Sequence, residues 1–580
     1  MPREREPSKS EKSSPPPGLR RTITRADLSQ CLPAKALSRT YARNHWQLVD
    51  YETQEGVRGV MAYAYPDDAC PELTLPLNVE GVHRVYLGIN YSKSAQSIWP
   101  AEGQLEVKLS DDLGFRRVAA EAGSVAEAGA PRFPSGQDLY KSIQETYWRT
   151  ADLSRRALVF RQPQAPYNLG IQARHSNLAY VRLEPLTEAE IRSWKSARPG
   201  PATRRMAAIY CTAHLTGSTD GTATFHPTTQ QWFRDEFAPY VDSDVGLFIF
   251  EALRGNFCLY KTRIGDVGSE NGRWGRHWVD PLSAFTRLAH RNGMEILAAL
   301  RMIGPQYPMN RTPLARARHY WQHPEWAKLD SEGIPLSNWS IAYPQVRQYW
   351  LNLLKETLGY GIDGIQLHLN RSTPFVMYEA PVVKAFQEKY GKDPRDLPET
   401  EPRIIAHRAE YLTQFVREVR ALLNEKPGRK LGATVFGPTK ESEQDEHFKL
   451  KSCVCDVETW LKEGLVDYVM PSPYIDTDVL RKWRELCGHG AHLWPDLMPR
   501  FQPAESYAKL ARKYYEAGAD GFCLWDAERR APHSSEWAAV RLLGHQDLLD
   551  RIIAEGPSWH RSVDLRTLGG FSAEHSFRDG

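Results

Sequence analysis

The chain has 580 residues, more than one hydrophobic core can organise, so its length predicts about two to four domains. Its formal net charge of +3, from 74 basic and 71 acidic residues, gives no electrostatic basis for binding nucleic acid. No apolar run approaches the ~20 residues that a membrane-spanning helix needs, so no membrane span is expected.

Residues 1–43 are charged and rich in proline and serine, a composition that buries little apolar surface and predicts disorder. Basic residues occur there without a following apolar stretch, so the segment lacks the pattern of a secretory signal. We therefore expect a cytoplasmic protein, unless the start site is misassigned. The eight cysteines follow neither a disulfide framework nor a zinc-ligand spacing, and no cofactor or metal is expected.

Residues 44–185 contain short runs rich in Val, Leu, Ile and Tyr, separated by turn residues. Several of these runs alternate apolar and polar positions, as half-buried antiparallel strands do. The pattern predicts a β-sandwich, with a jelly-roll-like accessory domain as the natural interpretation. Residues 186–205 follow as a linker, in which a short helix leads into a segment rich in Pro, Gly and Arg. The runs are "VRGVMAYAY", "ELTLPLNV", "GVHRVYLGINY", "GQLEVKLSDD", "RRALVFRQP" and "LAYVRLEPL".

Residues 206–556 alternate apolar strand-like runs with helical segments. Eight such runs, each almost continuously apolar, are typical of parallel strands covered by helices. They predict a (β/α)8 TIM barrel. An open, doubly wound sheet is the alternative, but no Gly-rich phosphate loop follows the first strand. Residues 557–580 are expected to form a C-terminal tail.

In such a barrel the site lies at the carboxyl ends of the strands, which sorts the polar residues into two groups. Asp363, Asp467 and Asp520 come where strands begin, so we interpret them as structural turn residues. Because strand side chains alternate, Gln366 and His368 share one face with Asn370. The polar residues that come where strands end, or in the loop after strand four, are His214, Glu251, Arg301, His368, Asn370, Arg371, Tyr474, Asp476, Asp496, Trp525, Asp526 and Glu379.

Five segments occur in an order and spacing that resemble the family-ten-like glycosyl hydrolase domain, a bacterial group of barrel glycosidases. They are "HPEWAKLDSEGIP", "NWSIAYPQVRQYW", "GYGIDGIQLHLNR", "YEAPVVKAFQEKYGKDP" and "VDYVMPSPY". The resemblance covers about 206–530 and implies a glycoside hydrolase fold with a carbohydrate ligand. The β-rich region before it is loosely similar to the accessory domains attached to such barrels.

The sequence departs from the resemblance at strand four, where relatives commonly carry an Asp and this chain has His368. Strand five, "LGATVFG", also ends without a Glu, so the carboxylate pair of amylase-like barrels is absent from both places. Glycoside hydrolysis needs two carboxyl groups. The first candidate pair is Asp496 with Glu379. The second is Glu251 with Asp526, whose strands are separated around the ring only by strand one.

Other residues at the strand ends are expected to bind sugar hydroxyls rather than to react: His368, Asn370, Arg371, Arg301, His214 and Tyr474. Trp525 is a candidate stacking platform beneath a sugar ring, although a core Trp is an equally good interpretation.

Two functions of different classes follow. The first is hydrolysis of O-glycosidic bonds in a poly- or oligosaccharide. The second is a catalytically silent barrel that binds carbohydrate and has lost its strand-four carboxylate to His368. A lyase or isomerase is a third possibility on the same fold, but the metal or phosphate site that such enzymes often need is not evident. The sequence predicts neither the sugar nor the oligomeric state.

Overall fold

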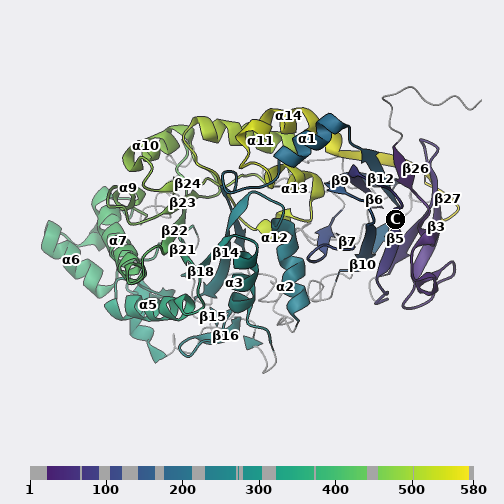
Figure 1. Ribbon diagram of the computed structural model, residues 1–580. Coiled ribbons are helices and arrows are strands. Elements are labelled where there is room, and N and C mark those ends of the chain that lie inside the picture. The colour runs from purple at the N-terminus through teal and green to yellow at the C-terminus, as the bar shows by residue number, and fades with distance from the viewer. Residues whose placement is uncertain are drawn as a thin grey trace, which may run out of the picture.

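The computed structural model describes residues 22–65, 68–90, 105–119, 141–163, 176–211, 229–255, 257–269, 272–273, 278–302, 322–370, 374–440, 455–500 and 502–573. Two antiparallel sheets are built mainly from the N-terminal part of the chain, and a parallel sheet with helices around it is built from the rest (Figure 1). No helix among the described residues has the length and apolar character to cross a membrane.

The two N-terminal sheets contain all six strands that the sequence predicts in 44–185. The first sheet runs in the order β1 (Ile23–Arg25), β12 (Tyr180–Pro185), β6 (Val82–Asn90), β9 (Ser142–Asp152), β26 (His560–Leu568), β3 (Trp46–Thr53), β4 (Arg58–Ala64) and β11 (Ser176–Leu178), with β2 (Leu37–Ser38) beside β3 and β27 (Phe571–Ser572) beside β26. The second sheet has the order β5 (Leu73–Pro76), β10 (Ala157–Arg161), β7 (Leu105–Leu109) and β8 (Arg116–Val118).

The two sheets bury their apolar side chains in one shared core. Trp46 of the first sheet and Phe160 of the second contact each other edge to face, with ring centroids 5.3 Å apart. Leu87 of β6 and Leu158 of β10 belong to the same core. The alternation of apolar and polar residues along these strands therefore has the physical cause that the sequence predicted, since one face of each sheet is buried.

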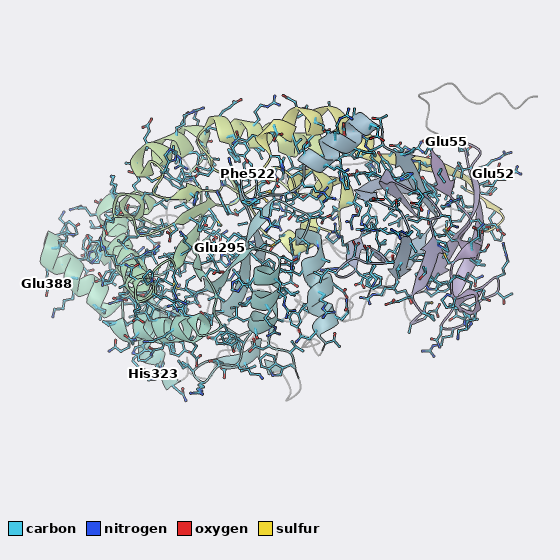
Figure 2. The ribbon with its side chains drawn as sticks, viewed as in Figure 1. Glu52, Glu55, Glu295, His323, Glu388 and Phe522 are labelled. Carbon is cyan, nitrogen blue, oxygen red and sulfur yellow. The ribbon has the colours of Figure 1, made fainter. Side chains whose placement is uncertain are left out.

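The last part of the chain is not a tail over its whole length, because β26 lies between β9 and β3 in the first sheet. Val563 and Leu565 of β26 are buried, whereas Ser562, Asp564 and Arg566 are exposed. Arg561 pairs with Glu55, and Arg566 pairs with Glu52. Both glutamates are labelled beside β3 in Figure 2. The period-two pattern of "SVDLR" was the sequence signal for this strand.

Structure also begins inside the segment expected to be disordered, since β1 pairs with β12. The helix expected in the linker is α1 (Glu188–Ser196), whose first turn is closed by reciprocal hydrogen bonds between Thr187 and Glu190. The 3-10 helices are η1 (Leu28–Gln30), η2 (Ala34–Ala36), η5 (Ala238–Tyr240), η7 (Pro324–Trp326), η8 (Pro394–Asp396), η10 (Gln546–Leu548) and η11 (Gly556–Trp559).

All eight strands that the sequence predicts in 206–556 are present, and each pairs in parallel with its neighbours. Their order is β25 (Phe522–Leu524), β13 (Met206–Tyr210), β14 (Val245–Arg254), β18 (Glu295–Arg301), β21 (Gly364–His368), β22 (Lys430–Val435), β23 (Tyr468–Pro471) and β24 (His492–Leu493). A parallel bridge between Asp496 and Cys523 joins the β24 end of this series to β25. The N–H of Cys523 also donates to the carbonyl of Pro495, 3.1 Å away.

Helices follow the strands and cover their outer side chains. They are α2 (Gln230–Phe237), α3 (Pro281–Arg291), α5 (Pro344–Leu358), α6 (Ala380–Tyr390), α7 (Pro402–Asn424), α9 (Val457–Lys462), α10 (Thr477–Cys487), α11 (Ala504–Glu516), α12 (Ala527–Arg530), α13 (Ser534–Val540) and α14 (Leu549–Glu555). The short strands β15 (Phe257–Cys258), β16 (Asp266–Ser269) and β17 (Gly272–Arg273) extend the sheet beyond β14, and β19 (Ala327–Leu329) pairs with β20 (Pro335–Trp339).

Alternate residues of the parallel strands enter two different cores. Ala208 and Tyr210 of β13 pack into the core shared with the helices, whereas Ala207 and Ile209 pack into a second core formed by the strands. A strand buried on both faces must be apolar throughout, which explains the uninterrupted apolar runs in the sequence.

The three Asp residues at strand starts have the structural role that the sequence predicts. Each carboxylate accepts the backbone N–H of a neighbouring strand: Asp363 from Ile296 at 2.8 Å, Asp467 from Leu431 at 2.7 Å and Asp520 from Leu493 at 2.8 Å. These bonds fix the amino ends of the strands and leave the opposite ends for the candidate site.

Candidate functional site

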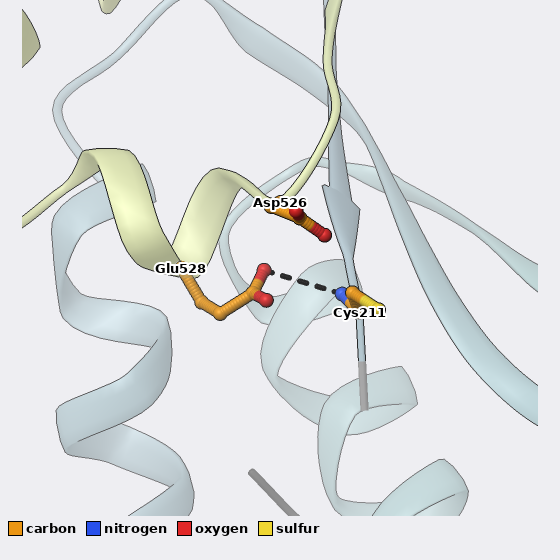
Figure 3. A group of neighbouring side chains, drawn as sticks. All are labelled: Cys211, Asp526 and Glu528. Atoms are coloured by element: carbon orange, nitrogen blue, oxygen red, sulfur yellow. Dashed lines mark hydrogen bonds between the residues drawn. The ribbon is translucent and has the colours of Figure 1, made fainter. Parts of the chain in front are cut away.

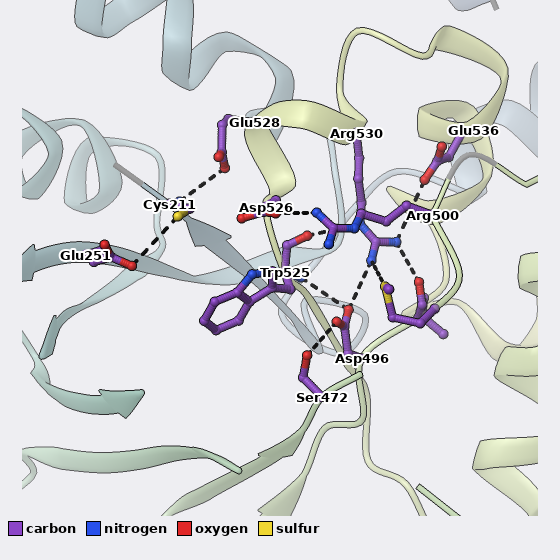
Figure 4. A network of polar contacts seen from close by, with 12 residues as sticks. Cys211, Glu251, Ser472, Asp496, Arg500, Trp525, Asp526, Glu528, Arg530 and Glu536 are labelled. Atoms are coloured by element: carbon purple, nitrogen blue, oxygen red, sulfur yellow. Dashed lines mark hydrogen bonds and ion pairs between the residues drawn. The ribbon is translucent and has the colours of Figure 1, made fainter. Parts of the chain in front are cut away.

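Acidic and basic side chains gather where β13, β14, β18 and β25 end (Figure 4). Cys211 follows β13, Glu251 lies in β14 and Arg301 closes β18. Asp526 follows β25 and adopts a left-handed backbone conformation, with a φ of 51°. Non-glycine residues in this conformation are uncommon and recur at functional sites.

Three acids surround the Cys211 residue. Its sulfur lies 3.8 Å from Oε2 of Glu251, and its backbone N–H donates to Oε2 of Glu528 at 3.2 Å. The sulfur, a carboxylate oxygen of Asp526 and one of Glu528 all lie within 4.8 Å of one another (Figure 3). Through the shared thiol, Glu251 and Asp526 are no more than about 9 Å apart, within the range of glycosidase carboxylate pairs.

Guanidinium groups hold these acids in place. Nη2 of Arg301 lies 2.8 Å from Oε2 of Glu251 and 3.7 Å from the Cys211 sulfur. Nη1 of Arg500 forms an ion pair with Oδ2 of Asp526. The thiol of Cys211 and the carboxylates of Asp526 and Glu528 lie close enough together to hold a metal ion, and the Arg301 guanidinium in contact with the thiol already supplies positive charge beside them.

The two neighbouring acids have opposite pKa shifts. Burial opposes ionisation of Asp526, but the charges of Arg500, Arg529 and Arg301 outweigh it and hold its pKa well below the ordinary value. Burial, followed by the negative charge of Asp526, raises the pKa of Glu528 well above its ordinary value. Burial together with the Asp526 charge therefore favours the protonated form of Glu528, and the arginines favour the ionised form of Asp526.

His368 lies on the inner face of β21, as the strand alternation predicts, and is fully buried. Its Nδ1 is 3.2 Å from the hydroxyl oxygen of Thr434, which also accepts from Gln366 at 2.8 Å. Its Nε2 has no hydrogen-bond partner among the described residues, and neither has Oδ1 of Asn370. Burial and the charge of Arg301 hold the pKa of His368 well below its ordinary value, so the ring is neutral at neutral pH.

Trp525 packs between two of these groups and is only 3% exposed. The His368 ring meets it edge to face with centroids 4.8 Å apart, and the Arg301 guanidinium carbon lies 5.4 Å from its centroid. Its use as a stacking platform for sugar stays a prediction.

Asp496 is buried beside this cluster, with both carboxylate oxygens engaged. Oδ2 accepts from the Ser472 hydroxyl at 2.9 Å. Oδ1 accepts from the Trp525 backbone N–H at 3.2 Å and from Arg530 at 3.1 Å. Burial raises its pKa, and the nearby Arg530 and Arg500 charges act against this rise. These bonds tie the ends of β23 and β25 to the segment after β24.

The described contacts of Glu379 are with residues outside this acid cluster. It immediately precedes α6, is buried, and accepts the backbone N–H of Met377 at 2.9 and 3.2 Å. Burial raises its pKa, and the nearest opposing charge is Lys328. No contact between described residues joins Glu379 to Asp496, so their pairing stays a prediction, whereas the structure brings Glu251 and Asp526 together.

The remaining candidates lie outside this cluster or outside the described chain. Tyr474 is 39% exposed. Asp476 precedes α10 and accepts the backbone N–H of Lys440 at 2.6 Å. His214 and Arg371 fall outside the described residues.

Three residues that sequence reasoning did not single out are central to the cluster: Cys211, Glu528 and Arg500. Cys211 directly follows the first strand, and Glu528 stands two residues after Asp526 in "LWDAERR". A charged run directly after a barrel strand was the available signal.

The middle of the chain matches a known protein family. Residues 257–481 match the family model of glycosyl hydrolase-like 10. The resemblance that the sequence motifs indicated is therefore confirmed over these residues. The matched part, less than half of the chain, includes Arg301 and His368, while Glu251, Asp526 and Glu528 lie outside it.

Several solved structures are weakly similar to this chain in both sequence and fold. The catalytic domain of a β-amylase from Paenibacillus polymyxa is 10% identical, with a TM-score of 0.40, over 60% of this chain and 98% of that one. A cycloalternan-degrading enzyme from Trueperella pyogenes is 12% identical, with a TM-score of 0.35, over 88% and 76%. A morphinone reductase mutant is 14% identical, with a TM-score of 0.31, over 55% and 82%. Such scores carry no argument about the chemistry of this chain. No curated protein matches its sequence.

Proposed function

We propose that residues 206–556 form a (β/α)8 TIM barrel that hydrolyses O-glycosidic bonds of a poly- or oligosaccharide, and that the two N-terminal sheets form a β-sandwich. Support for the barrel comes from eight parallel strands whose pairings continue through the Asp496–Cys523 bridge. Support for the sandwich comes from the core that both N-terminal sheets share. The glycosyl hydrolase-like 10 match supports the hydrolase chemistry.

The observation that carries the mechanism is the close approach of two carboxyl groups after β25, where oxygens of Asp526 and Glu528 lie within 4.8 Å of each other, and their pKa values shift in opposite directions. A group kept protonated can act as general acid, and a neighbour kept ionised can act as nucleophile or base. We assign the first role to Glu528 and the second to Asp526, because burial and Asp526 raise one pKa while arginines lower the other.

The spacing of the two groups favours retention of the anomeric configuration. Retaining glycosidases hold their carboxyl groups about 5–5.5 Å apart, and inverting ones leave about 6.5–9.5 Å for a water molecule. Oxygens of Asp526 and Glu528 lie within 4.8 Å of each other. The Asp526 carboxylate would attack the anomeric carbon while Glu528 protonates the leaving oxygen as the glycosidic bond breaks. The Glu528 carboxylate would then take a proton from the water that hydrolyses the Asp526 ester.

Other acids of the cluster have supporting roles in this scheme. Glu251 is the alternative base, since it also contacts Cys211 and lies no more than about 9 Å from Asp526. Asp496 is a positioning residue, because its oxygens hold the backbone of Trp525 and the side chain of Arg530. His368, Asn370 and Arg301 would bind sugar hydroxyls.

The second candidate function is carbohydrate binding without catalysis. It is favoured by the near-complete burial of Glu251, Asp526 and Glu528, and by His368 standing where relatives of the family carry a carboxylate.

A screen of purified protein against a glycan panel, reading both binding and reducing-end release, separates the two functions. For any glycan that is cleaved, Asp526→Asn and Glu528→Gln should each lower turnover at least about a hundredfold. The exposed Asp478→Asn on α10 is the matched control and should leave turnover unchanged. Binding without release by the unaltered protein would support the silent barrel instead.

A further inference from the structure

A pocket that shares no lining residue with the acid cluster lies between the N-terminal sheet and the helices at the end of the parallel sheet. Its walls come from β6 and β9, from α1, and from α13 and α14, which lie side by side in Figure 1. Its volume is about 510 Å³, within the ~300–1,000 Å³ range of small-molecule sites. We call it the interdomain groove.

Aromatic rings line the interdomain groove on two sides. Trp194 of α1 is half-buried, and the guanidinium carbon of Arg198 lies 4.9 Å from its centroid. Tyr147 of β9 stacks on Trp559 with centroids 5.3 Å apart at an interplanar angle of 29°. Tyr147 and Trp559 are each only 7% exposed, so the half-buried indole of Trp194 is the ring that can pack against a flat apolar surface and keep a polar edge free for hydrogen bonds.

The charges of the groove are closely balanced, since six arginines and five acids line it. Arg156 pairs with Asp111 at 2.8 Å, and Arg149 pairs with Asp112 at 2.8 Å. Arg551 pairs with Glu555 at 3.1 Å. Among the described residues, Arg198 and Arg541 are the lining arginines without an ion pair to a carboxylate, and Nη1 of Arg541 donates to the backbone carbonyl of Asp242.

This balance decides between two classes of ligand. An anion needs unpaired cations, and here four of the six lining arginines form ion pairs with a neighbouring carboxylate. A paired guanidinium and carboxylate instead present fixed donors beside fixed acceptors. Neighbouring hydroxyl groups of a sugar can accept from the first and donate to the second. An aromatic face beside such pairs completes a surface for a neutral sugar ring.

We propose that the interdomain groove binds a neutral oligosaccharide, at a site separate from the acids of the strand ends. This inference goes beyond the proposed hydrolysis and does not require turnover. Because the groove joins β9, α1 and α14, a bound chain would contact the N-terminal sheet and the helices of the parallel sheet together.

The test uses the full chain carrying Asp526→Asn and Glu528→Gln, so that binding is read without cleavage. Maltohexaose, cellohexaose and chitohexaose are titrated by calorimetry, with a galacturonic acid hexamer as the anionic comparator. The proposal expects at least one neutral hexasaccharide to bind, and Trp194→Ala to weaken that binding at least about tenfold. Trp326→Ala, which removes a half-buried indole far from the groove, is the matched control and should leave the affinity unchanged.

Asp111→Asn gives a second reading that does not depend on Trp194, since Asp111 is exposed and its replacement leaves Arg156 unpaired. It should weaken the neutral ligand and strengthen the galacturonic acid hexamer. The proposal is overturned if no neutral hexasaccharide binds, if only the acidic one binds, or if Trp194→Ala and Asp111→Asn both leave a neutral ligand's affinity unchanged. If the unaltered protein hydrolyses no glycan but the groove binds a neutral hexasaccharide, the proposed hydrolysis is wrong and the groove proposal stands.

Discussion

The strand that returns from the end of the chain, β26, gives a stability prediction of defined size. Leu565 is 2% exposed and packs with Val563, Ile143 and Tyr51 in a small core on the N-terminal sheet. Truncating a fully buried Leu to Ala costs about 2–5 kcal/mol, because it removes apolar contact and leaves a cavity. Leu565→Ala should therefore destabilise the first sheet by that amount, out of a typical total of about 5–15 kcal/mol.

Hydrogen exchange read by mass spectrometry resolves this change, because peptides from β3 and β9 report the sheet apart from the parallel strands. A loss of 2 kcal/mol accelerates exchange through global opening roughly thirtyfold, and each further 1.4 kcal/mol adds another factor of about ten. Arg566→Ala, one residue away and 64% exposed at its side chain, is the matched control and should shift stability by no more than about 0.5 kcal/mol. Unchanged exchange of β3 and β9 in Leu565→Ala would refute the assignment of β26 to this sheet.

Three further predictions concern buried charges. Asp496→Ala should lower the free energy of urea unfolding by about 1–3 kcal/mol, because it removes the nearer of two carboxylates beside the buried Arg530 guanidinium and leaves Glu536, 3.8 Å away; a cost below about 0.5 kcal/mol would contradict the role assigned to Asp496. The folded pKa of Glu528 is raised, so the folded state holds a proton that the unfolded state loses, and stability should fall as pH rises above about 4.5; Glu528→Gln should flatten that fall, and an unaltered profile would argue against the shift. Burial lowers the pKa of Lys328 to about 8. Between pH 8 and 10.5 the ammonium is protonated in the unfolded chain but not in the folded one, so stability should rise with pH over this range. Lys328→Met should abolish this rise in thermal unfolding.

Much of the fold was predictable because it depends on periodicity. Strands buried on both faces must be apolar throughout, and strands of the N-terminal sheets must alternate, so both patterns are visible in the sequence. The expected tail was the exception. Its strand pairs with β9 and β3, which lie more than 400 residues earlier in the chain, and no local pattern indicates so distant a partner.

The candidate site was predictable only in part. The order of the strands around the ring indicated that Glu251 and Asp526 would lie on either side of strand one. Cys211, at the end of that strand, contacts Glu251 and lies beside Asp526. The division of roles between Asp526 and Glu528 was not predictable, because it depends on where Arg500 and Arg529 are held in three dimensions. Arg500 lies in the loop after β24 and Arg529 lies in the short helix α12, and the sequence does not show which acid each of them will approach.

We propose Asp526 as the nucleophile and Glu528 as its acid and base partner. The most direct measurement treats Glu528→Gln with a glycosyl fluoride of a sugar that the protein cleaves. Fluoride leaves without a protonated acid, and the missing base slows release of the sugar, so a covalent glycosyl–enzyme should accumulate. Peptide mass spectrometry should then place one added glycosyl group on Asp526. An adduct on Glu251 or Asp496, or no adduct while the fluoride is consumed, would contradict it.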